Sequence, residues 1–146
     1  MHANAGVARL VLLALMLASR PAAAIPACPE GGAGEPSGRA LALKNAAQDF
    51  RDSEAWVEAA RSFRNAADAL PACETFDDER LRWSLWAVEA LEKAGTPTEE
   101  RSAMSDFLAR QLAVLEEHET GRSLPDLPQL QAAHEQLRPA ATGRED

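Results

Sequence analysis

From residue 39 onward, apolar residues recur every three or four positions, a spacing that places them on one face of an α-helix. No stretch alternates between apolar and polar residues in the manner typical of a β-strand. The pattern predicts helices over about residues 38–51, 54–70, 77–94, 97–119 and 127–137. Short connections between them favour antiparallel packing. The expected fold class is all-α, with about two antiparallel helical hairpins followed by a short C-terminal helix.

Residues that cap helices mark the expected helix starts. The predicted N-caps are Ser37 for the first helix, Asp52 or Ser53 for the second, and Thr75 for the third. The fourth helix has the strongest start signal, because the run Thr-Pro-Thr-Glu at residues 96–99 matches a capping box with proline at the first helical position. Each boundary is therefore predicted from the few residues around it.

A nine-residue apolar run, LVLLALMLA, occupies residues 10–18 near the start of the chain. At 1.5 Å per residue in a helix, this run is far shorter than the ~30 Å hydrocarbon core of a membrane, so it predicts no stable membrane insertion. A positive residue precedes the run, and the small residues Ala22 and Ala24 follow it. These features are typical of a secretory signal peptide, whereas a buried helix would be interrupted by Pro21. We therefore expect residues 1–24 to be removed and the protein to act in the periplasm or outside the cell.

The remaining chain divides by composition into three parts. Residues 25–38 are rich in glycine and proline and have no apolar period, which predicts a flexible leader. Residues 39–138 carry the helical pattern and form the single expected domain. Residues 139–146 begin with a proline that ends the last helix, and they are expected to be a disordered tail.

The chain has two cysteines, Cys28 and Cys73. In an oxidising compartment an even pair is more often bridged than free, so export predicts a disulfide between them. Closing a loop of about 45 residues would stabilise the fold by ~4 kcal/mol on the chain-entropy model. The alternative is a lipoprotein anchored at Cys28, although Pro26 fits the lipidation pattern poorly.

Acidic residues outnumber basic ones by 23 to 15, and the net charge is −8. Removal of residues 1–24, which hold two arginines and no acid, makes the charge −10. Both values work against the phosphate neutralisation on which nucleic-acid binding depends, and against an anionic membrane surface. We therefore expect another protein or a peptide segment as the partner, and no nucleic acid. Self-association stays open.

Candidate catalytic and metal-binding residues are few. The histidines are His2, His118 and His134, and the last two are expected on the solvated surface because neither has a second histidine or cysteine at metal-ligand spacing. The chain has no nucleophile elbow, phosphate-binding loop or dinucleotide-binding motif. We therefore expect no enzyme activity, no cofactor and no metal.

The first two expected helices carry a spacing that resembles the tetratricopeptide repeat. Residues that match its first-helix pattern are Leu43, Ala46, Ala47 and Phe50, and those that match its second-helix pattern are Ala59, Phe63, Ala66 and Pro71. Small alanines let two antiparallel helices approach closely while aromatic residues fill the space around them. Residues 40–71 therefore resemble one tetratricopeptide unit.

The third and fourth helices resemble a second, looser unit. Its matching residues are Ala87, Val88, Leu91, Gly95, Ala103 and Phe107. Seven extra residues precede this unit, three lengthen its turn, and no proline closes it. Two units are fewer than the three that such arrays normally need, so the last helix, the disulfide or self-association would complete the core. A plain four- or five-helix bundle is the alternative architecture.

The resemblance also implies a binding face, because partner peptides lie along the first helix of each tetratricopeptide unit. Carried over residue by residue, this face comprises Leu41, Lys44, Gln48, Arg51, Arg82, Leu85, Glu89 and Glu92. The stripe of Lys44, Gln48 and Arg51 is basic on an acidic protein, which suits a carboxylate or an acidic segment. An ordinary solvated helix face is the alternative.

These expectations favour binding over catalysis. We predict an exported protein–protein interaction module, an adaptor or assembly factor of the cell envelope, that presents a rigid helical groove to its partner. Trp83 and Trp86 cannot point the same way on a helix, so one of them is a candidate partner anchor, with both in the core as the alternative. The alternative function is a small exported helical bundle that sequesters an apolar ligand or holds an unfolded client.

Overall fold

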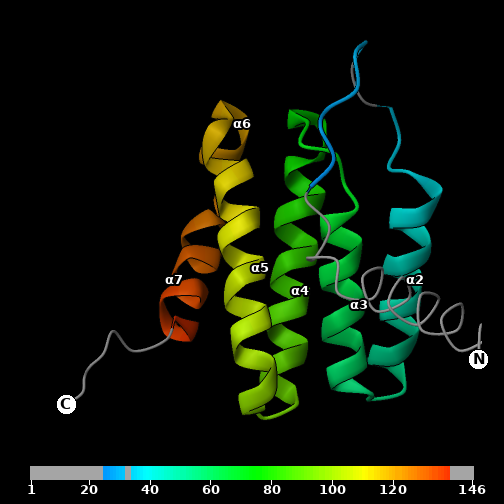
Figure 1. The fold of residues 1–146 in the computed structure, drawn as a ribbon, viewed down its shortest axis with the longest axis vertical. Helices are drawn as coiled ribbons and strands as arrows, with labels where there is room; N and C mark the ends of the chain where they lie inside the picture. Colours follow the sequence, from blue (N-terminus) through cyan, green and yellow to red (C-terminus); the bar gives the residue numbers. More distant parts are fainter. Residues whose placement is uncertain (1–24, 32–33, 139–146) are drawn as a thin grey trace, which may run out of the picture.

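The computed structural model describes residues 25–31 and 34–138, and every regular element within them is helical (Figure 1). In chain order the elements are α2 (Gly38–Asp52), α3 (Trp56–Asp68), the 3₁₀ turn η1 (Glu74–Phe76), α4 (Asp77–Lys93), α5 (Thr98–Glu117), α6 (Glu119–Arg122) and α7 (Leu127–Leu137). The all-α prediction is confirmed. The signal peptide predicted over residues 1–24 and the tail predicted over residues 139–146 lie outside the described residues.

The five predicted helices correspond to α2, α3, α4, α5 and α7, and each end agrees to within two residues. The short elements η1 and α6 were not predicted. Figure 1 shows the five longer helices side by side in chain order. Both α2 and α4 pack closely against α3, and α4 also contacts α5 and α7. Helices that follow one another in the chain are therefore neighbours in space, and α4 lies among three others.

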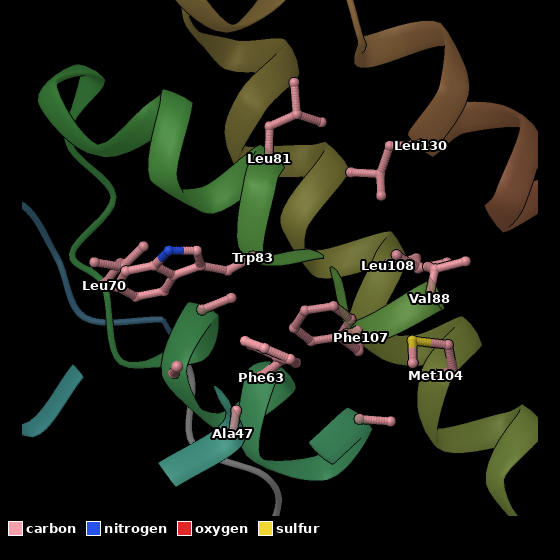
Figure 2. Packing of buried hydrophobic residues seen from close by; sticks show 14 of the residues in the cluster. Ala47, Phe63, Leu70, Leu81, Trp83, Val88, Met104, Phe107, Leu108 and Leu130 are labelled. Carbon is pink, nitrogen blue, oxygen red and sulfur yellow. The ribbon is translucent and has the colours of Figure 1, made fainter. Parts of the chain in front are cut away.

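Small residues on α3 allow this close packing. Ala59, Ala60, Ala66 and Ala67 are all 0% exposed, so α3 has no bulky side chain on much of the surface that faces its neighbours. Aromatic side chains from three helices fill the space that remains, and Figure 2 shows Phe63, Trp83 and Phe107 in the centre of this core. The dense interior follows from alternating small and large residues across the helix contacts.

Ser37 caps α2 as predicted, because its Oγ accepts a hydrogen bond from the backbone N–H of Ala40 at 3.2 Å. The caps predicted for α3 and α4 are wrong. Ser53 instead closes α2, since its Oγ donates to the carbonyl of Asp49 at 2.9 Å and α3 begins after Ala55 without a side-chain cap. The turn η1 leads directly into α4, so Thr75 lies inside that turn.

The capping box predicted at residues 96–99 is also wrong. Thr96 has a φ of 49° and follows Gly95, whose φ is 83°. In this left-handed turn the N–H of Thr96 donates to the carbonyl of Leu91 at 2.9 Å, so Thr96 ends α4 and α5 begins only after Pro97. A residue that suits the start of one helix is here used to finish the helix before it.

The predicted disulfide is present: the structure bonds Cys28 to Cys73, with the two Cα atoms 5.0 Å apart. Beside it, the N–H of Ala72 donates to the carbonyl of Pro26 at 2.9 Å. The described part of the predicted leader is therefore tied to the connection between α3 and α4. Among the described residues, no helix combines the length and the apolar character that a membrane crossing requires.

Candidate partner-binding surface

The eight residues of the predicted binding face lie on two helices. On α2, Leu41, Lys44, Gln48 and Arg51 are all partly buried. On α4, Leu85 is partly buried, and Arg82, Glu89 and Glu92 are exposed. Their spacing places each set along one face of its helix.

Three of these residues come together around Trp86, which is outside this set of eight but was named with Trp83 as a candidate partner anchor. The guanidinium carbon of Arg51 lies 5.3 Å from the centre of the Trp86 ring, and that of Arg82 lies 5.9 Å from it. Both distances suit a cation–π contact. Leu85 shares a surface depression with Arg82 and Trp86. We name the group of two arginines and one tryptophan the Arg51–Trp86–Arg82 cluster.

The core holds the tryptophan of this cluster in place. The Trp86 ring packs against Phe63 of α3 with their centres 5.6 Å apart and their planes tilted by 59°. Arg51 also lies over Phe63, at 5.6 Å from that ring centre. Trp86 is partly buried, whereas Trp83, three residues earlier, is only 2% exposed. Trp83 thus belongs to the core, whereas the partly buried Trp86 contacts two arginines.

The two arginines of the cluster differ in their other contacts. Arg82 forms an exposed ion pair with Asp78, with its Nη1 2.9 Å from the carboxylate oxygen Oδ2. Within residues 25–31 and 34–138, no carboxylate forms an ion pair with Arg51. A guanidinium presents several N–H donors, and the ring contact uses none of them in a hydrogen bond. Arg51 is therefore able to bind an anionic group from outside.

A depression of about 240 Å³ adjoins the cluster. Its apolar lining comes from Leu81, Leu85 and Trp86 of α4. Polar groups of Asp78, Arg82 and Asp126 also line it, the last from the connection between α6 and α7. Trp86 and Arg82 belong both to the depression and to the cluster, so an apolar contact and a cationic contact are available side by side.

The other predicted face residues do not join this group. Leu41, Lys44 and Gln48 lie nearer the start of α2, and in the part of the chain that the structure describes they form no hydrogen bond or ion pair with the cluster and do not line its depression. Glu89 and Glu92 lie one to two turns beyond Trp86 on α4. Within the described residues, neither acid forms an ion pair with Arg51 or Arg82. The structure therefore narrows the predicted face to Arg51, Arg82 and Leu85, and adds Trp86.

A second polar cluster is enclosed in the core. Arg80 is 0% exposed, and its two terminal nitrogens donate to the carbonyls of Ala67, Leu70 and Pro71 at 2.7–3.1 Å. The same side chain donates to Oε1 of Gln111 at 2.7 Å. Desolvation by burial lowers the pKa of Arg80 to about 10, so the group still carries its charge at neutral pH. Because these donors bond acceptors near the end of α3 and on α5, Arg80 has a structural role.

A third cluster joins the start of α4 to the end of α5. Asp77 is 2% exposed, and its carboxylate oxygens lie 3.0 and 3.2 Å from Nδ1 of His118. The Thr120 hydroxyl donates to the same carboxylate at 2.6 Å. His118 was expected on the solvated surface. That prediction is wrong, because His118 is partly buried and contacts Asp77, which lies 41 positions earlier in the chain. Local spacing cannot reveal such a partner.

A fourth polar group links α3 to α5. Glu100 is 5% exposed and pairs with Arg61 and Arg64. The hydrogen bond from Arg61 lowers the pKa of Glu100 more strongly than burial raises it, and the charges of both arginines add to the lowering. Glu99 and Glu100 both lie in the first turn of α5. The buried Glu100 pairs with Arg61 and Arg64, whereas Glu99 is exposed and forms no ion pair within the described residues.

A depression of about 300 Å³ lies between α5 and α7, on a different side of α5. It is lined by Ala109, Leu112, Ala113, Glu116, Gln131, His134 and Glu135. His134 is thus partly buried here rather than fully solvated. In the part of the chain that the structure describes, no group of three or more histidine, cysteine or carboxylate side chains is arranged to hold a metal ion.

Comparisons of the chain with known protein families, with curated proteins and with solved structures found no significant match. The arrangement of its own residues is therefore the basis for assigning a function. In the Arg51–Trp86–Arg82 cluster, Arg82 is shared with Asp78, whereas Arg51 forms no ion pair with any carboxylate of the described residues.

Proposed function

We propose that this protein is an exported interaction module that binds a segment of a partner protein on the face formed by α2 and α4. One observation carries the proposal: Arg51 and Arg82, from two helices, converge on the partly buried Trp86. Tryptophan and arginine are the residues most often found at the energetic centre of protein interfaces. The surface belongs to the face that the tetratricopeptide resemblance implies for partner binding.

The rigidity of this surface supports a binding role. The Trp86 ring packs against Phe63, whose side chain is 0% exposed, and α4 contacts three other long helices. A surface that is already ordered loses little conformational entropy when a partner binds. The mechanism is therefore static, with preformed helices presenting side chains to the partner.

The cysteine pair supports export of the module. A disulfide persists in the periplasm and outside the cell, whereas thiols in the cytosol are kept reduced. The pairing also argues against the lipoprotein alternative, because a Cys28 sulfur that is bonded to Cys73 has no thiol left to carry a lipid. An adaptor or assembly factor of the cell envelope fits these features.

Sequestration of an apolar ligand is less well supported. Sites for small molecules have volumes of about 300–1,000 Å³ and mostly apolar linings. The two depressions, of about 240 and 300 Å³, lie at or below this range and carry charged residues in their linings. Their size and polarity favour contacts with single side chains over enclosure of a lipid.

Affinity capture from the organism's own envelope tests the proposal. The bait is the disulfide-bonded protein, compared with its Arg51→Glu variant and with Arg39→Glu as the matched control. Arg39 is exposed on the same helix, and its substitution makes the same change of charge. We expect a protein retained by the parent and by Arg39→Glu to be lost from Arg51→Glu. Equal retention by all three baits would overturn the assignment of this face.

A further inference from the structure

We infer that the partner segment carries a large apolar side chain next to a single carboxylate. The apolar side chain occupies the depression formed by Leu81, Leu85 and Trp86, and the carboxylate binds the guanidinium of Arg51 beside it. This inference rests on the proposed function and specifies the chemistry of the partner.

The size of the depression indicates that a single side chain of the partner occupies it. Its volume of about 240 Å³ is below the range of sites that enclose a whole small molecule. Leu85 and Trp86 are both partly exposed, so the apolar floor is open to solvent in the free protein. Covering such a floor with an aliphatic or aromatic side chain removes apolar area from water on both partners.

The charges around the depression decide where the carboxylate lies. Arg82 is shared with Asp78, so a carboxylate from a partner has to compete for it. Arg51 pairs with no carboxylate of the described residues, and it lies against the same Trp86 ring. The primary anchor is therefore Arg51, and Arg82 contributes a second cation on the same tryptophan.

The charge of the whole protein limits the number of acids that the partner carries. The net charge is −8, and the exposed acids Glu89 and Glu92 lie beyond the cluster on α4. A run of several acids would be repelled by these groups, because like charges close together are destabilising. One or two carboxylates over Arg51 avoid that repulsion. The surface thus selects a short motif and disfavours a polyacidic segment.

A competing occupant is a basic side chain that pairs with Asp78 and Asp126 at the edge of the same depression. Asp78 already has a partner in Arg82, whereas Arg51 has none among the described carboxylates. The observations therefore favour the acidic motif, and the basic one is an outcome that the test can return.

The test is a selection from a library of random linear peptides on the disulfide-bonded protein. Peptides enriched on the parent protein are then tested for binding to Arg51→Gln, to Asp78→Asn and to the control Arg39→Gln. We expect the enriched peptides to carry leucine, isoleucine, phenylalanine or methionine within two positions of aspartate or glutamate. A labelled peptide of the enriched sequence is then measured by fluorescence polarisation.

Replacement of its acid by the amide, or of its apolar residue by alanine, is expected to weaken binding at least about tenfold, which corresponds to ~1.4 kcal/mol. Leu85→Ser is expected to weaken binding of the parent peptide but not of the alanine peptide, because the two changes remove the same contact. Enrichment of basic peptides that depend on Asp78 would overturn the inference and leave the binding face standing. Failure to enrich any peptide that depends on Arg51 or on Asp78 would overturn both.

Discussion

Arg80 and Arg82 lie two positions apart on α4, yet their side chains have opposite surroundings. Arg80 is 0% exposed and donates to three backbone carbonyls and to Gln111. The Arg82 side chain is 46% exposed, pairs with Asp78 and lies over the Trp86 ring. Because an α-helix has 3.6 residues per turn, two positions point to nearly opposite sides. An arginine is structural where neighbouring elements supply acceptors, and available for binding where they do not.

The energies of the two sites differ for the same reason. Without Arg80, the carbonyl of Leu70 and Oε1 of Gln111 would lose their donor, at a cost of ~1–3 kcal/mol per group, whereas the carbonyls of Ala67 and Pro71 still accept from backbone N–H groups. An exposed cation–π contact such as that of Arg82 contributes only ~0.5–1 kcal/mol, and a ring contact leaves the N–H donors of an arginine available for a carboxylate. Arg80 is thus fixed by several buried hydrogen bonds. Arg51 is held by ring contacts, and Arg82 by one ring contact and one exposed ion pair.

The largest effect is expected for Arg80→Met, which keeps most of the side-chain volume and removes every donor. The carbonyl of Leu70 and Oε1 of Gln111 would lose their donor, and we expect the free energy of unfolding to fall by about 3–5 kcal/mol. Arg51→Met is the matched control and is expected to change it by less than about 1 kcal/mol. Urea unfolding followed by circular dichroism measures both. Equal losses would show that the two sites do not differ as proposed.

An intermediate effect is expected when Cys28 and Cys73 are both changed to serine. The disulfide closes a separation of 45 positions, and its loss is expected to cost about 2–4 kcal/mol. Arg80 and the disulfide hold the same connection, since Arg80 bonds Leu70 and Pro71 just before Cys73. Combining the serine changes with Arg80→Met should therefore cost less than the two losses added together. Strict additivity in urea unfolding would contradict this shared role.

The smallest of the three effects is expected for Glu100→Gln, which weakens the link between α3 and α5 by about 1–2 kcal/mol at pH 7. Because the pKa of Glu100 is lowered in the folded protein, its charge stabilises the fold above the unfolded pKa of about 4, and this contribution is lost as the pH falls through the folded value. Thermal midpoints of parent and variant should therefore converge below pH 4. Glu99→Gln is the control, since Glu99 is exposed. A difference that is constant from pH 7 to pH 3 would contradict the pairing.

Much of the fold was predictable because helices are encoded locally. Apolar periodicity placed five helices to within two residues, and Ser37 was correctly identified as a cap. The other predicted caps are wrong, because a polar residue at a turn can either begin the next helix or end the one before it. Ser53 and Thr96 suit the start of a helix by type, but the backbone path makes each of them end the preceding helix.

The candidate site was predictable only in part. Helical spacing correctly placed Arg51, Arg82 and Leu85 on exposed or partly exposed faces. It could not show that Arg51 meets Trp86, because these residues lie on different helices and the contact depends on how α2 and α4 are set against α3. Trp86 had been named beside Trp83 as a candidate anchor, but the two lie only about 60° apart around a helix, so spacing could not show which of them is buried.

The sequence by itself determined the all-helical class, the helix limits and the pairing of the only two cysteines, because these depend on residue type and on short-range spacing. Only the tertiary structure decided which polar groups are used up inside the fold and which remain for a partner. Asp77 with His118, Glu100 with Arg61, and Arg80 with Gln111 each join positions more than 30 residues apart. Such pairs depend on the packing of whole helices, which the residues near each one do not encode.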